Sequence, residues 1–317
     1  VDYILGIPLF AQKIGKENLS SLLCRLGNPE KSIPAVHVAG TNGKGSTCRA
    51  LAQMLTGMGY RVGLFISPHL VSINERIQID GENISDADFV WAFETVKEKF
   101  TQHPSFFEVM FAMAAVYFRE KKCDFVVYET GMGGRLDATN VLMPELSIIT
   151  SVGMDHMEYL GDTIEKIAAE KAGIIKPGIP IIYFKRDEAV AKVIEDTARG
   201  QKSPVIPVEK QDYIINHLGD KTIDFSLHSR YYSYCNLVIQ KTSLYQLENI
   251  SLAVMAFYGL MKARNASEED IENGIRETLP EFYWEGRMEE IAPHIYVDGA
   301  HNVEAIRAYI DTMRTLH

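Results

Sequence analysis

Apolar residues in this chain recur in short continuous runs, and segments with helical spacing separate these runs. The runs predict buried strands at 36–39, 61–66, 124–130, 146–150, 179–184 and 205–208. Helical spacing predicts helices over 47–58, 85–100, 106–121, 162–175 and 188–199. Strands that alternate with helices predict an α/β fold, with a doubly wound and mostly parallel sheet.

Other patterns occupy the two ends of the chain and the region after residue 208. The leucines at 19, 22, 23 and 26 predict one or two short helices within 1–33. Residues 213–240 alternate between apolar and polar side chains, which predicts a small antiparallel sheet. Two helices are expected over 244–263 and 268–278, and a further strand and helix over 295–298 and 302–316.

These patterns suggest a main domain over 1–280, a linker over 281–287 and the start of a second unit over 288–317. A proline, Pro280, immediately precedes the linker, and the linker itself contains Gly286. Residues 299–317 are too few for a separate domain of about 50 residues or more. We therefore expect 288–317 to be the first strand and helix of a domain whose remainder is absent.

The stretch from 36 to 47 is typical of a phosphate-binding loop. A buried strand leads into a turn with three glycines, and a helix follows. Glycines let backbone N–H groups converge on an anion, and the start of a helix adds a positive dipole. The spacing departs from Gly-x-x-x-x-Gly-Lys-Ser/Thr, because the first glycine comes two positions late and Gly45 occupies the hydroxyl position. A glycine-rich turn without a ligand is the alternative. The residues expected to bind nucleotide here are Gly40, Thr41, Asn42, Gly43, Lys44, Gly45, Ser46 and Thr47.

Composition narrows the possible partners and the compartment. The formal net charge is −10, which argues against nucleic acid and anionic membranes as partners. The four cysteines are far apart and form no metal-binding pair, which favours reduced thiols and a cytoplasmic location. No apolar run approaches the ~18 residues of a membrane span, and the first residues do not resemble a signal peptide.

Polar residues that could bind a metal ion or take part in catalysis follow several predicted strands. Glu129 ends the most apolar run beside a glycine loop, as expected of a carboxylate that binds magnesium with phosphate and water. Asp155-His156 follows the next strand, and Lys171 lies near the end of an otherwise apolar helix. A solvated acid, a structural histidine and a solvated lysine are the respective alternatives. Asp137 could contact a polar substrate or form an Asx-type turn.

Five further segments accompany the phosphate loop in a fixed order. They are Ser67-Pro68-His69-Leu70, 129–140, Asp155-His156, Glu170-Lys171-Ala172-Gly173 and Asp298-Gly299-Ala300-His301-Asn302. Together with 38–46, this set closely resembles the folylpolyglutamate synthase/dihydrofolate synthase branch of the Mur ligase superfamily. The resemblance extends from about residue 26 to the end, and the family's shifted loop accounts for the misfit noted above.

The resemblance implies a role for each matching residue. Lys44 and Ser46 would contact phosphates, and Ser46, Ser67 and Glu129 would belong to a first magnesium site. A second magnesium ion would lie among Glu129, His156 and a carbamylated Lys171. Asn249, Arg287 and Asp298 would contact the nucleotide, with His301 in the same loop, although Tyr245 stands where the family has a histidine. The substrate would meet Asp137, Pro68 and His69, and the catalytic set would be Lys44, His156, Lys171 and Arg287.

The implied reaction is ATP-dependent ligation of L-glutamate to a folate or to dihydropteroate through an acyl phosphate, in a monomeric enzyme. In the family a further C-terminal domain closes over the site. We therefore expect a chain of this length to bind ATP weakly and to be nearly inactive as a ligase. Two alternatives stay open: another Mur-type amino-acid ligase, and a non-catalytic nucleotide-binding module.

Overall fold

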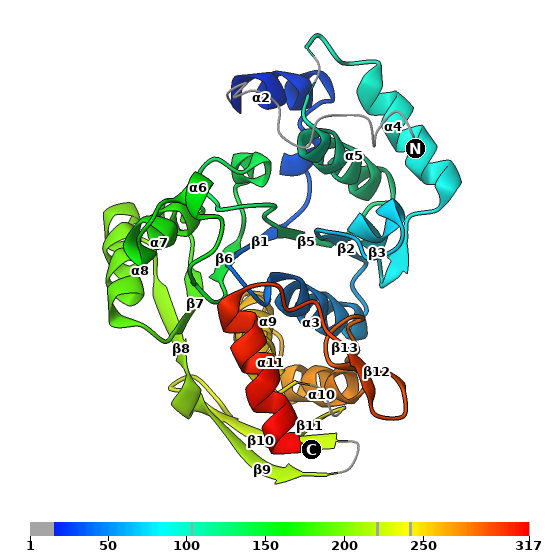
Figure 1. Cartoon of the computed structure of the whole chain (residues 1–317). Coiled ribbons are helices and arrows are strands. Elements are labelled where there is room, and N and C mark those ends of the chain that lie inside the picture. Colours follow the sequence, from blue (N-terminus) through cyan, green and yellow to red (C-terminus); the bar gives the residue numbers. More distant parts are fainter. Residues whose placement is uncertain (1–15, 103, 220–221, 241–242, 317) are drawn as a thin grey trace.

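The structure is a computed structural model that describes residues 16–102, 104–219, 222–240 and 243–316. Its main sheet has eight strands in the order β4–β3–β2–β5–β1–β6–β7–β8 (Figure 1). Neighbouring strands along β2–β5–β1–β6–β7–β8 are parallel, whereas β3 pairs antiparallel with both β2 and β4 at one edge of the sheet. The α/β fold with a doubly wound sheet is thus confirmed. The strands are β1 Ala35–Ala39, β2 Val62–Phe65, β3 Ile77–Ile79, β4 Glu82–Asn83, β5 Phe125–Glu129, β6 Leu146–Ile149, β7 Ile181–Lys185 and β8 Val205–Glu209.

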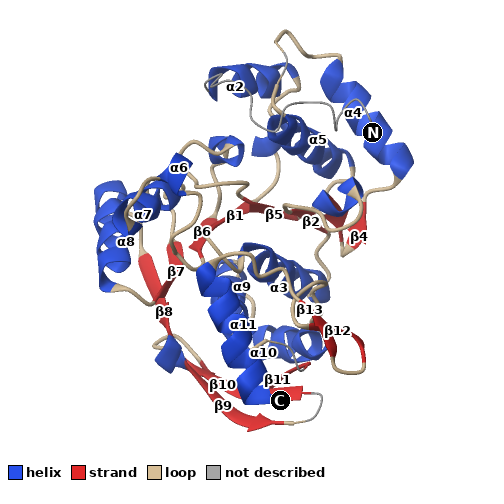
Figure 2. Cartoon of the chain, in the orientation of Figure 1, coloured by secondary structure: helices blue, strands red, loops and turns tan. Residues whose placement is uncertain are grey.

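Helices cover both faces of this sheet (Figure 2). Along β5, Phe125 and Val127 join the core beneath α3 and α9, whereas Val126 and Tyr128 join the core beneath α5. This alternation explains why β5 is apolar throughout, because both of its faces are buried. The helices are α2 Lys16–Arg25, α3 Lys44–Gly57, α4 Asp86–Lys97, α5 Phe106–Glu120, α6 Met157–Leu160, α7 Ile164–Ala172, α8 Glu188–Gln201, α9 Gln246–Ala263, α10 Glu268–Thr278 and α11 Val303–Leu316.

A small antiparallel sheet lies beyond the edge strand β8 (Figure 1). It consists of β9 Tyr213–Leu218, β10 Thr222–His228 and β11 Ser233–Gln240, in the order β11–β10–β9. Ile223, Phe225 and Leu227 alternate along β10 and are buried in the same core as α9 and α10. The antiparallel strands expected over 213–240 are therefore confirmed.

The C-terminal residues form a hairpin and a helix that lie against the main body. β12 Glu289–Ala292 pairs with β13 Ile295–Val297 in a two-stranded antiparallel sheet, and α11 follows. β12 was not predicted, because its Glu-Glu-Ile-Ala sequence has neither an apolar run nor alternation. α11 lies in front of α9 (Figure 1), and the backbone N–H of Leu244 donates to Oγ1 of Thr312 at 3.3 Å.

Several element boundaries differ from the prediction. α3 begins at Lys44 rather than at residue 47, because its glycine-rich first turn lacks the apolar spacing that marks a helix. The helix expected over 162–175 begins at Ile164, after the N-cap Thr163, and ends at Ala172. In the expected linker, Phe282 is buried in the core and Trp284 packs against it.

At the N-terminus, α2 accounts for the leucine spacing, and the part of that prediction on residues 1–15 lies outside the described residues. In the described part of the chain, no helix has both the length and the apolar character to cross a membrane.

Candidate functional site

The phosphate loop connects the end of β1 to α3, and two close approaches require glycine there. Gly43 has a φ of +85° and is the N-cap of α3. A Cβ at this position would lie 2.0 Å from Oδ1 of Asn249. A Cβ at Gly40 would lie 1.8 Å from Oγ1 of Thr150. The loop can therefore pass between α9 and the end of β6 only where side chains are absent.

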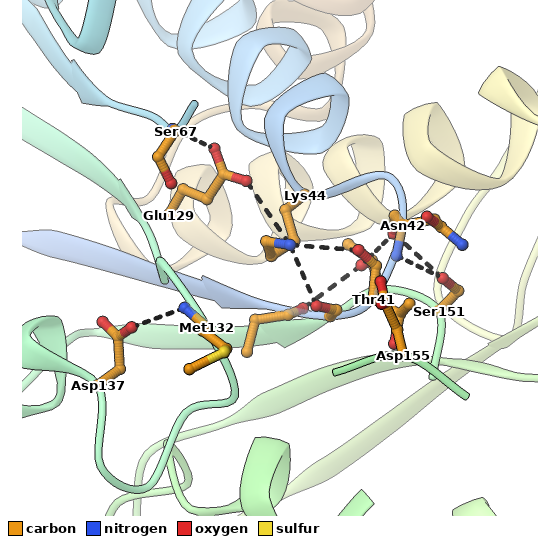
Figure 3. A network of polar contacts seen from close by, with 12 residues as sticks. Thr41, Asn42, Lys44, Ser67, Glu129, Met132, Asp137, Ser151 and Asp155 are labelled. Carbon is orange, nitrogen blue, oxygen red and sulfur yellow. Dashed lines mark hydrogen bonds and ion pairs between the residues drawn. The ribbon is translucent and has the colours of Figure 1, made fainter. Parts of the chain in front are cut away.

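Backbone and side-chain hydrogen bonds from the residues after β6 hold the loop in place (Figure 3). The N–H of Thr41 donates to the carbonyl of Ser151 at 2.7 Å, and that of Asn42 donates to Oγ of Ser151 at 3.0 Å. Oγ1 of Thr41 donates to the carbonyl of Gly153 at 3.2 Å. Two neighbouring strand ends thus shape the cradle together, as expected for the carboxyl edge of a parallel sheet.

Two lysines meet at the carbonyl of Gly40. Nζ of Lys44 donates to the carbonyls of Gly40 and Thr41, each at 3.2 Å (Figure 3). Nζ of Lys171 donates to the Gly40 carbonyl at 2.9 Å, and this residue is only 3% exposed. A solvated helix face is therefore excluded for Lys171. Burial first, and the charge of Lys44 second, lower the pKa of Lys171 to about 7.

Glu129 lies at the end of β5 and is 3% exposed, which excludes a solvated acid. Its Oε2 accepts a hydrogen bond from the N–H of Ser67 at 2.9 Å, and its Oε1 lies 3.9 Å from Nζ of Lys44 (Figure 3). Burial raises the pKa of this carboxyl, while Lys44, the Ser67 N–H and Arg287 oppose the increase. A further cation beside Glu129 would favour the ionised form.

A first cavity extends from the phosphate loop to α11. It brings together many of the predicted residues: Thr41, Asn42, Gly43, Lys44, Gly45, Ser46, Ser67, Pro68, Glu129, Asn249, Arg287, Asp298 and His301. It also contains residues that were not predicted: Ser151, Phe184, Arg186, Tyr245, Glu248, Leu252, Glu304, Ala305 and Ala308. Phe184 lies near the end of β7 and Arg186 directly follows it, so their position at a strand end was an available signal. The apolar residues on α9 and α11 carry no such signal, because they have the spacing of ordinary core residues.

Hydrogen bonds across this cavity attach the C-terminal segment to the body. The hydroxyl of Tyr245 donates to Oδ2 of Asp298, which also accepts from the N–H of Met288 at 2.9 Å. The side-chain amides of Asn42 and Asn302 bond to each other at 2.9 and 3.2 Å. The loop before α11 therefore contacts the phosphate loop directly.

A second cavity, of about 330 Å³, adjoins the first. It shares Gly45, Ser67, Pro68, Glu129 and Arg287 with the first cavity. Its outer part lies between α3, the β3–β4 hairpin and the segment from Tyr283 to Arg287, and it includes the indole of Trp284. Glu129 and Arg287 thus mark a junction where groups bound in the two cavities would meet.

Some predicted residues lie outside both cavities. The His156 side chain is 53% exposed, and its Nε2 lies 4.0 Å from Oδ1 of its neighbour Asp155. Among the described residues, no three His, Cys, Asp or Glu side chains are grouped to hold a metal ion. Nδ1 of His69 accepts a hydrogen bond from Nε of Arg76 at 2.8 Å. Thr47 is buried, and its Oγ1 donates to the carbonyl of Asn249 at 3.4 Å.

Asp137 caps the 3₁₀ helix Ala138–Val141. Its Oδ1 accepts from the N–H of Thr139 at 3.0 Å and from the Thr139 hydroxyl at 2.5 Å, while its Oδ2 accepts from the N–H of Met132 at 2.9 Å (Figure 3). The structure therefore contains the Asx-type turn that was the alternative to a substrate contact. Burial raises the pKa of this carboxyl, and the same hydrogen bonds oppose the increase.

The fold and the site define a nucleotide-binding protein of the Mur ligase type. The family model described as "Mur ligase middle domain" matches residues 38–257. This match contains the phosphate loop, Glu129, Lys171 and Asn249.

Comparison with individual proteins narrows the class. The chain is 40% identical to the dihydrofolate synthase/folylpolyglutamate synthase of Bacillus subtilis, over 99% of this chain and 75% of that protein. It is 33% identical to the folylpolyglutamate synthase of Lacticaseibacillus casei, over 100% of this chain and 76% of that protein. A solved FPGS–AMPPCP–folate complex superimposes with a TM-score of 0.92 at 32% identity, covering 100% of this chain and 79% of the other. The chain belongs to the folylpolyglutamate synthase/dihydrofolate synthase family.

Proposed function

We propose that this chain is an ATP-dependent ligase that joins L-glutamate to a folate acceptor through an acyl phosphate. One observation carries the proposal: the phosphate loop and a second cavity meet at Glu129 and Arg287. A phosphoryl donor in the first cavity and a carboxylate in the second would be adjacent there. The family membership and the relatives' names support the same reaction.

The side chains at the junction suit phosphoryl transfer to a carboxylate. Lys44 and Arg287 would neutralise charge on the transferred phosphoryl group, and the N–H groups at the start of α3 would bind its oxygens. Asn249 and Asp298 would contact the rest of the nucleotide, and its base would lie against the apolar side chains of Phe184, Leu252 and Ala305. Positioning is as important as charge, since the amine of glutamate must come within ~3–3.5 Å of the activated carbon.

The residues near Lys44 fit a magnesium ion. Oγ of Ser46 is buried and has no hydrogen-bond partner among the described residues. It is a hydroxyl oxygen of the kind that completes a magnesium shell in phosphate loops, and Glu129 supplies a buried carboxylate. Ser46, Ser67 and Glu129 would hold this ion. When bound, it would neutralise phosphate charge.

A second cation requires a modified Lys171. As an amine, Lys171 donates to Gly40 and does not fit a cation shell with Glu129 and His156. A pKa of about 7 leaves much of this amine neutral near pH 7.5, and the neutral form attacks CO2. The new N–C bond forms as one proton leaves Nζ, and the product is an anionic carbamate. NMR with 13C-labelled bicarbonate should therefore give a carbamate signal that is lost in Lys171→Met.

Acceptor-dependent turnover tests the proposed function. ADP release should require both glutamate and either dihydropteroate or a monoglutamyl folate, and a UDP-sugar acid should not replace them. Enzyme and ATP should be used at similar concentrations, so that a single turnover is detected. Asp137, Pro68 and His69 stay predicted acceptor contacts; Pro68 lines the second cavity, whereas the Asp137 carboxylate would first have to release its hydrogen bonds within its own loop. We expect a monomer. ADP release with the UDP-sugar acid would favour another Mur-type ligase. ATP binding without acceptor-dependent turnover would favour a nucleotide-binding module.

A further inference from the structure

The outer part of the second cavity contains one cationic side chain that the proposed mechanism does not use. Arg49 lies on α3, four residues after Gly45, and both residues line this cavity. Four residues of α-helix advance by about 6 Å, so Arg49 lies one turn farther from the junction with the nucleotide cavity. A group held at the junction could therefore have a second group bound by Arg49.

The guanidinium of Arg49 is fixed in place, yet only partly satisfied. Nη1 donates a weak hydrogen bond to Oε1 of Gln78 at 3.4 Å. Nε is buried and has no hydrogen-bond partner among the described residues. A Cβ on Gly81 would lie 2.9 Å from Nη1, so the β3–β4 turn packs directly against the guanidinium. This arrangement positions an arginine whose donor capacity is largely unused.

The other charged residues near Arg49 do not replace a ligand. Glu82 and Glu285 line the same cavity. Burial lowers the pKa of Arg49, and the negative charges of these two carboxylates oppose that decrease. Glu75 also lines the cavity, but its carboxylate accepts three backbone N–H groups, from Leu70, Val71 and Ser72. Because Glu82 and Glu285 would repel each additional negative charge, the cavity suits a single carboxylate on the guanidinium better than a long polyanion.

We propose that Arg49 binds the α-carboxylate of the glutamyl residue whose γ-carboxylate is being ligated. This inference rests on the proposed function and specifies its acceptor. The two carboxyl carbons of a glutamyl residue are separated by four C–C bonds, or ~5 Å, which matches one helical turn. A guanidinium binds a carboxylate through two parallel hydrogen bonds. Arg49 is thus a specificity-determining residue, because dihydropteroate lacks this second carboxylate.

Binding of two matched ligands tests the inference. Folate and pteroate differ only in the glutamyl residue, so their affinity ratio isolates the proposed contact. Calorimetry with saturating AMPPCP and magnesium should show that Arg49→Gln weakens folate binding by about 10- to 100-fold, the usual effect of losing a charged hydrogen-bond partner. Pteroate binding should change less than about twofold, and Arg49→Lys should give an intermediate loss for folate. Arg199→Gln, on the exposed face of α8, is the matched control.

The outcomes separate this inference from the proposed function. Equal losses for folate and pteroate would mean that Arg49 only supports the cavity, and an unchanged folate affinity would overturn the inference directly. If the wild-type chain bound neither ligand, the acceptor assignment itself would fail. Thermal unfolding of each variant checks its fold, and Arg49→Lys preserves the charge if Arg49→Gln unfolds. Turnover provides a second readout: kcat/KM should fall for the monoglutamyl folate and stay unchanged for dihydropteroate.

Discussion

Replacing Tyr245 with Phe would remove one hydroxyl from the contact between the body and the C-terminal segment. This hydroxyl donates to Asp298, whose carboxylate also accepts the backbone N–H groups of Met288 and Ala300, at 2.9 and 2.8 Å. These two bonds lie within the C-terminal segment, so they persist when it moves. The Tyr245 hydroxyl bridges to α9, and its loss should weaken the docking of α11.

The free energy lost in Tyr245→Phe depends on the two groups that this hydrogen bond joins. A hydrogen bond to a charged group contributes about 1.5–3 kcal/mol. Tyr245 is only half-buried, and the Asn42–Asn302 pair and the Thr312 hydroxyl still hold the segment. We therefore expect the lower end, about 1.5 kcal/mol, which corresponds to about tenfold more frequent local opening of α11.

Hydrogen exchange of backbone amides measures this opening. In Tyr245→Phe, the amides of α11 should exchange about tenfold faster, while those of β1 and β5 should not change. Tyr283→Phe is the matched control, because its hydroxyl donates to Glu289 at 2.5 Å on the exposed surface and joins two residues six apart in the chain. Unchanged exchange in α11, or an equal effect in Tyr283→Phe, would refute the reasoning.

Three further predictions concern packing, charge and proton binding. Gly63→Ala should lower the free energy of unfolding in urea by about 1–3 kcal/mol, because its Cβ would lie 2.7 Å from the Phe118 ring; an unchanged value would contradict the tight packing of β2 against α5. Glu129→Gln keeps an oxygen for the Ser67 N–H but loses the charge, so magnesium should no longer strengthen AMPPCP binding as it does in the wild type; a retained magnesium effect would exclude Glu129 as a ligand. In buffer without CO2 or magnesium, the free energy of unfolding should rise with pH between about 7 and 10.5, because unfolded Lys171 binds a proton that the folded residue has lost. The slope should reach at most about 1.4 kcal/mol per pH unit and should disappear in Lys171→Met.

The parts of the fold that the sequence predicts best are those with continuous apolar runs. β5 is buried on both faces, so its run of apolar residues ending in Glu129 identified both the strand and a polar group at its end. The first turn of α3 was not predicted, because glycines and Lys44 stand where a helix usually has regularly spaced apolar residues. β12 was not predicted either, because a short and largely exposed hairpin strand needs no apolar pattern.

The site was predictable where residues follow strand ends and unpredictable where helices provide them. Phosphate-loop residues, Ser67 and Glu129 follow from their positions after strands. Leu252 and Ala305 have the spacing of core residues, and only the packing of α9 and α11 places them on a cavity. The direction of a side chain is likewise not encoded locally: His156 follows a strand but is exposed, and the carboxylate of Asp137 is occupied by its own loop.

The central claim is that a phosphoryl group passes from ATP to the acceptor's carboxylate. An acceptor labelled with 18O in both carboxylate oxygens tests it, with enzyme and ATP at similar concentrations and glutamate in excess. The carboxylate oxygen that attacks phosphorus leaves with phosphate when the amine displaces it. Mass spectrometry should therefore find one 18O atom in each phosphate released, and only with acceptor present. Unlabelled phosphate would contradict the account, because the phosphoryl group would then have passed to water.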